Sequence, residues 1–142
     1  MPNRAKTILD AVVAKLTGLA TTGANVKASR AYNVPATPAL TVFMGEEQEV
    51  SQSEAKVRKA REIKILIHVA EKEDLVDDKI LQIEAEIWAA LTADYTQGLS
   101  FVYETSFQST SPFELEQGGK VSGQAEQTWI IYYSHSPTSM EA

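Results

Sequence analysis

Two histidines, His68 and His135, are the side chains of this sequence best suited to acid–base or metal chemistry near neutral pH. His68 lies in the run IKILIHVA at positions 63–70, where apolar residues at every second position predict a β-strand with one face toward the core. By this alternation His68 projects from the opposite face. His135 falls in a segment, 134–142, that we expect to be a loose C-terminal tail. The spacing therefore predicts a structural role for His68 and no catalytic pair.

The acidic cluster and the glycine pair of this sequence both have simple structural explanations. Asp74, Asp77 and Asp78 lie close enough together to hold a hard cation. Acids in the first turn of a helix also accept hydrogen bonds from free N–H groups and complement the helix dipole, and we favour this interpretation. The glycine pair Gly118–Gly119 does not lie between a strand and a helix, which is the context that a phosphate-binding loop requires. The sequence thus predicts no enzyme activity, no metal site and no cofactor.

Composition narrows the class of protein further. The chain has 142 residues, the size of one domain, and no cysteine, which excludes disulfides and thiolate metal sites. Its net charge of −6 would repel phosphate backbones and anionic lipids, and no run of 18 apolar residues occurs. We therefore expect neither nucleic-acid binding nor a membrane partner.

Hydrophobic periodicity predicts an α/β (α+β) fold in the single domain 1–142. The expected architecture is a mixed or antiparallel sheet of four to five strands with two helices on one face, in the order α-β-β-β-α-β-β. A capped amphipathic pattern predicts each helix, and alternating or β-branched runs predict the strands. The expected helices span 4–17 and 75–92, and the expected strands span 26–32, 39–44, 62–71, 99–107 and 128–134, with a loop at 109–123 before the last strand.

Segregated charges lie between the second and third expected strands. Acidic residues come first and basic residues follow: Glu46, Glu47 and Glu49, then Lys56, Arg58, Lys59 and Arg61. A turn at 51–54 would set Val50 opposite Ala55 and align opposite charges across the two strands. The predicted pairs are Glu49–Lys56, Glu47–Arg58 and Glu46–Lys59, with Val42 opposite Ile63 and Leu40 opposite Ile65. The interpretation is a long β-hairpin with an apolar base and a charged arm; the alternative is a solvated loop.

Several quoted segments together resemble a known family. The initial helix, the strand PALTVFMG, the hairpin into REIKILIHVAE, the helix EDLVDDKILQIEAEIWAAL and the strands LSFVYETSF and TWIIYYS resemble tail terminator proteins of long-tailed bacteriophages, of the lambdoid minor tail protein U type. The likeness covers nearly the whole chain and consists of element order and spacing.

The resemblance implies a structural protein of the virion. It implies a hexameric ring of identical subunits at the head-proximal end of the tail, assembled in the host cytoplasm. The ring would cap the tail tube protein, stop tail polymerisation and offer a joining surface to a head-completion or neck protein. DNA would pass through the lumen without specific binding. The alternatives are another neck or tail-tube-like ring protein, and a small enzyme whose site the sequence does not reveal.

Candidate interface residues follow from the charged arm and this resemblance. On the arm they are Glu46, Glu47, Glu49, Lys56, Arg58 and Lys59. In the loop at 109–123, which is long for the family, Phe113 and Leu115 either form a docking contact or cover the sheet edge.

Overall fold

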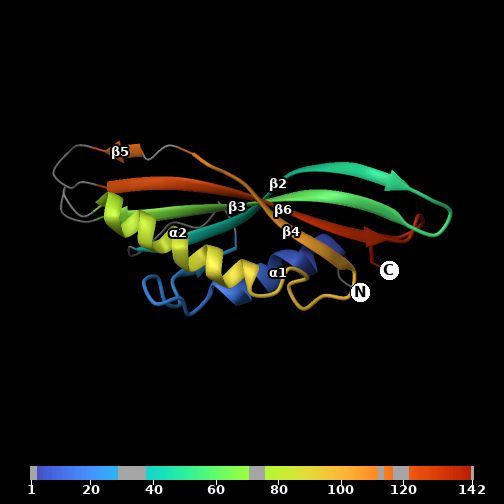
Figure 1. The fold of residues 1–142 in the computed structure, drawn as a ribbon, viewed down its shortest axis with the longest axis horizontal. Helices are drawn as coiled ribbons and strands as arrows, with labels where there is room; N and C mark the ends of the chain where they lie inside the picture. The colour runs from blue at the N-terminus through green and yellow to red at the C-terminus, as the bar shows by residue number, and fades with distance from the viewer. Residues whose placement is uncertain (1–2, 29–37, 71–75, 112–113, 117–121, 142) are drawn as a thin grey trace.

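One mixed sheet organises the chain, in a computed structural model that describes residues 3–28, 38–70, 76–111, 114–116 and 122–141 (Figure 1). The strands lie in the order β1-β2-β3-β6-β4, and the short β5 pairs with β6 beside β4. Only β1 runs parallel to its neighbour among these pairs. The elements are α1 (Arg4–Leu16), β1 (Val26–Lys27), β2 (Ala39–Gln52), β3 (Val57–Ala70), α2 (Val76–Thr92), β4 (Val102–Thr110), β5 (Glu114–Glu116) and β6 (Ser122–His135). The predicted class, order and mixed sheet are confirmed, with β5 as an addition inside the expected loop.

Helix α1 begins and ends where its sequence dictates. The Asn3 side chain accepts a hydrogen bond from the backbone N–H of Ala5 at 2.7 Å, which caps the first turn. Gly18 follows the helix with φ of +96°, a conformation that favours glycine. One face, comprising Ala5, Ile8, Val12 and Leu16, is buried. The helix packs through this face on β2 and α2.

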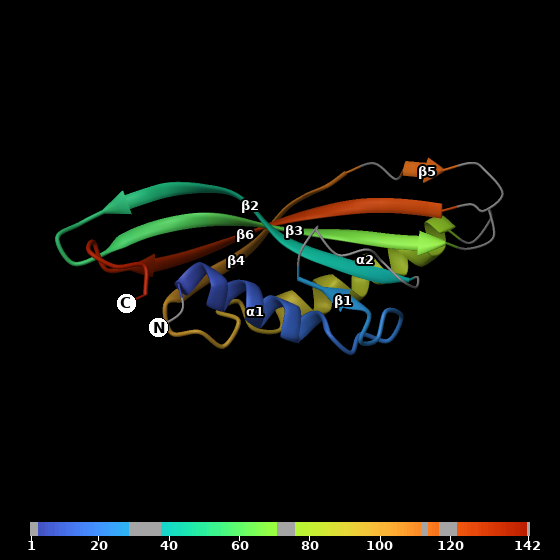
Figure 2. The ribbon, with the colours of Figure 1, turned by 180° about the vertical axis from the view of Figure 1, so that it is seen from behind.

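Helix α2 lies on the same side of the sheet as α1, as both Figure 1 and Figure 2 show, which confirms the expected arrangement. Asp77 and Asp78 lie in its first turn, the position in which acids favour the helix dipole. Asp74, the predicted cap, lies outside the described residues. The predicted stripe of Ile80, Ile83, Ile87 and Leu91 is buried against β3 and β6.

The two central strands have an unbroken register, unlike the strands that flank them. β3 and β6 pair without interruption from Val57 opposite His135 to Ala70 opposite Ser122. β2 has two register shifts against β3, and β4 has two against β6. Each shift places an extra residue on the outer strand, as in a β-bulge.

The final strand is longer than the sequence predicted. β6 begins at Ser122, not near Thr128, and the missed part, SGQAEQ, contains no β-branched or aromatic residue, so its pairing with β3 overrides a weak propensity. The C-terminal segment that we expected to be a loose tail, 134–142, is instead attached to the rest of the fold through residues 134–141. β6 includes His135, and the segment after it folds back so that the Arg4 backbone N–H donates to the Met140 carbonyl at 2.9 Å.

Candidate interaction surface

The hairpin arm, which we define as residues 45–61, ends in a turn that projects beyond both helices (Figure 2). The turn is closed by the Ser53 backbone N–H, which donates to the Lys56 carbonyl at 2.8 Å. A hairpin rather than a solvated loop therefore joins β2 to β3. The arm is the most extended feature of the described chain and holds six of the eight predicted interface residues.

The predicted register of the hairpin is wrong, because the turn lies at 53–56 and not at 51–54, although the predicted faces are right at the apolar base. Val42 lies opposite Ile65 and Leu40 opposite Ile67, two residues away from the predicted partners. A shift of two keeps the same side chains on each face of the sheet, so alternation alone did not distinguish the registers. In the arm the true partners are Glu47 with Arg61 and Glu49 with Lys59, not Glu47 with Arg58 and Glu49 with Lys56.

Two bulges explain the additional offset within the arm. Gly45 and Glu46 together face Glu62, and Val50 is an extra residue between the pairs made by Glu49 and Ser51. Glu46 consequently has no direct partner on β3, and the predicted Glu46–Lys59 pair is wrong. A Cβ at Gly45 would lie 2.9 Å from the Cβ of Glu62. The close approach of the strands at this bulge therefore requires glycine.

Glu47 is the centre of a charged network on the helix-side face of the arm. One carboxylate oxygen accepts hydrogen bonds from the Tyr133 hydroxyl at 2.6 Å and from Arg61 Nη1 at 3.1 Å. The other lies 3.3 Å from Lys59 Nζ. This single carboxylate joins β2 to β3 and β6, and it does so at the first bulge.

Burial and hydrogen-bond donors shift the pKa of the Glu47 carboxyl group in opposite directions. Burial by itself raises the pKa of Glu47, but hydrogen bonds from Tyr133 and Arg61 and the positive charges of Lys59 and Arg61 lower that pKa below its ordinary value of 4.5. Burial, followed by the bond to Glu47 and its negative charge, raises the pKa of Tyr133. The network is thus an ionised carboxylate held by a neutral phenol and two cations at neutral pH.

The other predicted arm residues lie toward the surface. Glu46, Glu49, Lys56 and Arg58 are all exposed. The Arg58 guanidinium lies 5.6 Å from the centre of the Tyr103 ring on β4. Glu47 and Lys59 are therefore brought together by the fold, whereas the remaining four are available at the surface.

The two interface residues predicted in the loop at 109–123 are Phe113 and Leu115. Phe113 lies outside the described residues. Leu115 belongs to β5, where its backbone is opposite Gly123 of β6. This pairing places Leu115 along β6 next to the end of β4, remote from the arm in the chain topology.

The arm has an apolar layer that sequence reasoning did not identify. Val57, Tyr133 and His135 are buried, and β6 accompanies β3 along the whole arm. The His135 ring lies beside the Tyr133 ring in a tilted arrangement, with ring centres 6.2 Å apart. The arm is thus part of the sheet rather than an isolated two-stranded ribbon, because residues 131–135 of β6, the last two of which belong to the expected tail, supply its third strand.

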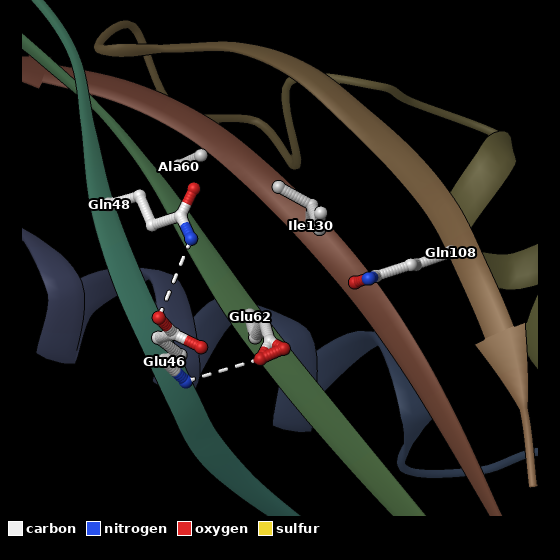
Figure 3. A pocket seen from close by; sticks show the side chains of 6 residues that line it. All are labelled: Glu46, Gln48, Ala60, Glu62, Gln108 and Ile130. Carbon is white, nitrogen blue, oxygen red and sulfur yellow. Dashed lines mark hydrogen bonds between the residues drawn. The ribbon is translucent and has the colours of Figure 1, made fainter.

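A shallow hollow of about 130 Å³ lies on the sheet face opposite the helices (Figure 3). Its lining consists of acids, amides and two apolar residues: Glu46, Gln48, Ala60, Glu62, Gln108 and Ile130. The Glu46 backbone N–H donates to Glu62, and the Gln48 amide donates to the Glu46 carboxylate, both at 3.4 Å. The polar side chains of this lining are two carboxylates and two amides.

His68 lies on that same face, as the alternation predicted. Its ring nitrogens lie 3.1 Å from the Thr41 hydroxyl and 3.4 Å from the Gln124 amide nitrogen. Burial lowers the pKa of His68. Within the described parts of the chain, no group of three or more His, Asp or Glu side chains could hold a metal ion.

A second surface, which we name the α2 patch, consists of Leu81, Glu84 and Trp88 of α2 and Phe107 of β4. Its three apolar side chains are exposed by 53% (Leu81), 49% (Trp88) and 37% (Phe107). The rings of Trp88 and Phe107 lie 5.4 Å apart, and each contacts the buried Trp129. The sequence places Leu81 and Trp88 beside the buried stripe, which was the available signal, but not Phe107 beside them.

The sequence matches no protein-family model and no curated protein sequence. Among the described residues, neither helix combines the length and the apolar character that crossing a bilayer requires.

Proposed function

We propose that this protein is a tail terminator: a structural subunit that forms a ring on the end of a bacteriophage tail tube, stops tube growth and joins the tail to the head. The proposal rests on the resemblance in element order and spacing. The observation that supports it most directly is the hairpin arm, which projects past both helices and carries exposed charged residues at its end.

The two ends of the subunit favour ring assembly over a symmetric dimer. The arm projects at one end of the sheet, whereas α2, which carries three of the four patch residues, lies along the other half (Figure 1). Different surfaces that join head to tail produce a closed ring when the rotation between subunits closes. Charged residues at the arm tip would give such contacts specificity.

Electron microscopy of lysates from phage lacking this chain tests the proposal. We expect overlong tails without heads, and normal particles when the wild-type chain is supplied in trans. Absence of tails would instead indicate a tube protein, and complete particles without the chain would exclude any role in tail completion.

Light scattering of the purified chain provides an independent measurement. A ring of the expected size has six times the chain mass of 15.6 kDa, either alone or after addition of tail tubes. A chain that stays at 15.6 kDa in both conditions would contradict the proposal.

A further inference from the structure

The α2 patch contains an acid that lacks a full set of partners. Glu84 lies between Leu81 and Trp88 on α2 and accepts a hydrogen bond from the Thr110 hydroxyl. Its Oε1 atom is buried without a hydrogen-bond partner in the described structure. Burial, opposed by the bond from Thr110, raises the pKa of Glu84. A buried carboxylate without a full set of donors is costly in the free subunit, and a positive charge that a partner places beside it would offset that cost.

The apolar part of the α2 patch also lacks a cover. Leu81, Trp88 and Phe107 are among the few large apolar side chains that the described chain exposes. Exposed apolar groups gathered around a polar group are typical of protein interaction sites. The matching surface is therefore one that combines an apolar side chain with a positive charge.

The arm tip offers this combination. Val50 is 53% exposed, and the second bulge makes it the unpaired residue of β2. Lys56, at the other side of the turn, is exposed and forms none of the ion pairs found in the described part of the chain. The bulge takes Val50 out of the regular pairing with β3, and a bulge can redirect a side chain away from its own sheet.

These two surfaces cannot meet within one subunit. The turn of the arm projects at one end of the sheet, whereas α2 underlies the other half (Figure 1). We propose that the α2 patch receives the arm tip of a second copy of this chain, with Val50 against the apolar side chains and the Lys56 ammonium beside the Glu84 carboxylate. The inference rests on the proposed ring and specifies which surfaces join its subunits.

Such a contact would change the environment of both charges. The arm would cover Leu81 and Trp88 and exclude water, and the Lys56 ammonium would lie beside the Glu84 carboxylate. Because a charge pair is strengthened when water is excluded, each partner would depend on the other. The contact joins two different surfaces, so an open chain of subunits keeps one free arm at one end and one free patch at the other until the ring closes.

Charge reversal and its compensation test the pairing. We expect Glu84→Lys or Lys56→Glu alone to weaken association about tenfold or more in light scattering or sedimentation, and the double variant to recover most of it. Gln82→Lys and Gln52→Glu introduce the same charges at exposed positions nearby and serve as matched controls. Equal association of the wild type and both single reversals would overturn the pairing.

Glu84→Gln separates an interface role from a merely structural one. Removing a buried charge should raise the melting temperature of the isolated subunit, whereas losing the partner of Lys56 should weaken association. A structural role predicts that both properties change in the same direction. This variant also keeps the test valid if Glu84→Lys fails to fold.

Crosslinking identifies the contact directly, because the chain contains no cysteine. Val50→Cys and Leu81→Cys proteins, mixed and treated with a short bis-maleimide, should give covalent dimers that neither protein gives alone. Val50→Cys mixed with Gln124→Cys, on the opposite sheet face, is the control. Dimers from Val50→Cys alone, or equal yields with Gln124→Cys, would overturn the proposed contact.

The outcomes distinguish this inference from the proposed function. Wild-type rings that are indifferent to Glu84 and Lys56 would overturn the contact and leave the terminator function intact. A wild-type chain that remains monomeric even with tail tubes would overturn both.

Discussion

The helix-covered half of the sheet and the hairpin arm share β2, β3 and β6 but are stabilised by different chemistry. In the covered half, aliphatic side chains such as Leu40, Ile65 and Ile67 are fully buried beneath the helices. On the same face of the arm, the corresponding positions hold Glu47, Lys59 and Arg61 around Tyr133. A continuous strand therefore passes from the core into a projection where hydrogen bonds and ion pairs around Glu47 take the place of aliphatic packing.

The largest loss of folding stability should come from a substitution in the helix-covered half of the sheet. Ile65→Ala removes a fully buried side chain beneath the helices and should lower the free energy of unfolding by about 2–5 kcal/mol. Ser51→Ala, on the exposed part of the arm, should change it by less than about 0.5 kcal/mol. Urea titrations measure both. Equal losses would show that the arm contributes as much as the core.

A smaller loss should follow from breaking the charge network. Glu47→Gln weakens the acceptor of Tyr133 and Arg61 and removes the charge beside Lys59, which should cost about 1–3 kcal/mol. Glu49→Gln, a matched change at an exposed site, should be nearly neutral. If the two variants had the same stability, the network would not hold the arm.

The pH dependence of that loss has a defined sign. Because the folded pKa of Glu47 lies below its ordinary 4.5, the ionised carboxylate stabilises the fold above pH 4.5. This contribution disappears as pH falls through the lowered folded pKa. The stability difference between the wild type and Glu47→Gln should therefore shrink between pH 4.5 and more acidic values in urea titrations, and a difference that grows there would contradict the assignment.

Ionisation of Glu84 should destabilise the fold, unlike ionisation of Glu47, and the change in the free energy of unfolding should be smaller. Its folded pKa is raised above 4.5, so ionisation at neutral pH destabilises the isolated subunit. Glu84→Gln should raise the free energy of unfolding by less than about 1 kcal/mol at pH 7. The gain should vanish below pH 4.5, where the acid is protonated in both states. Thermal melts of dilute, unassembled protein at pH 4 and pH 7 measure it.

The smallest effect is expected for His68→Gln. An amide can keep polar contacts with Thr41 and Gln124, so stability at pH 7.5 should change by less than about 1 kcal/mol. Because burial lowers the folded pKa of His68, the wild type should lose stability as pH falls below 6.5, and the variant should lose less. A variant that folds normally but loses the proposed tail-completing activity would instead indicate chemistry at His68.

Alternation predicted the strands and their faces but not their alignment. Val42 and Ile65 belong to strands that were recognised, yet their pairing was missed. The turn lies at 53–56, two residues beyond the predicted 51–54, and the bulges at Gly45 and Val50, which leave no periodic signal, shift the register again. Glu47 was one of three similar acids, and only the bulge singles it out. Tyr133 was unpredictable as its partner because β6 joins the sheet from 86 residues away in the chain. The α2 patch requires α2 and β4 to be docked before Phe107 joins Trp88.

The central position of β6 also constrains how the chain folds during synthesis. β3 pairs along its whole length with a strand that is made last among the sheet strands, so one of its edges stays open until residues 122–135 are available. Pairings between such distant segments form slowly, and an open apolar strand is an aggregation hazard in the meantime. We therefore expect nascent chains that stop before β6 to require chaperones, whereas the complete chain closes its own sheet.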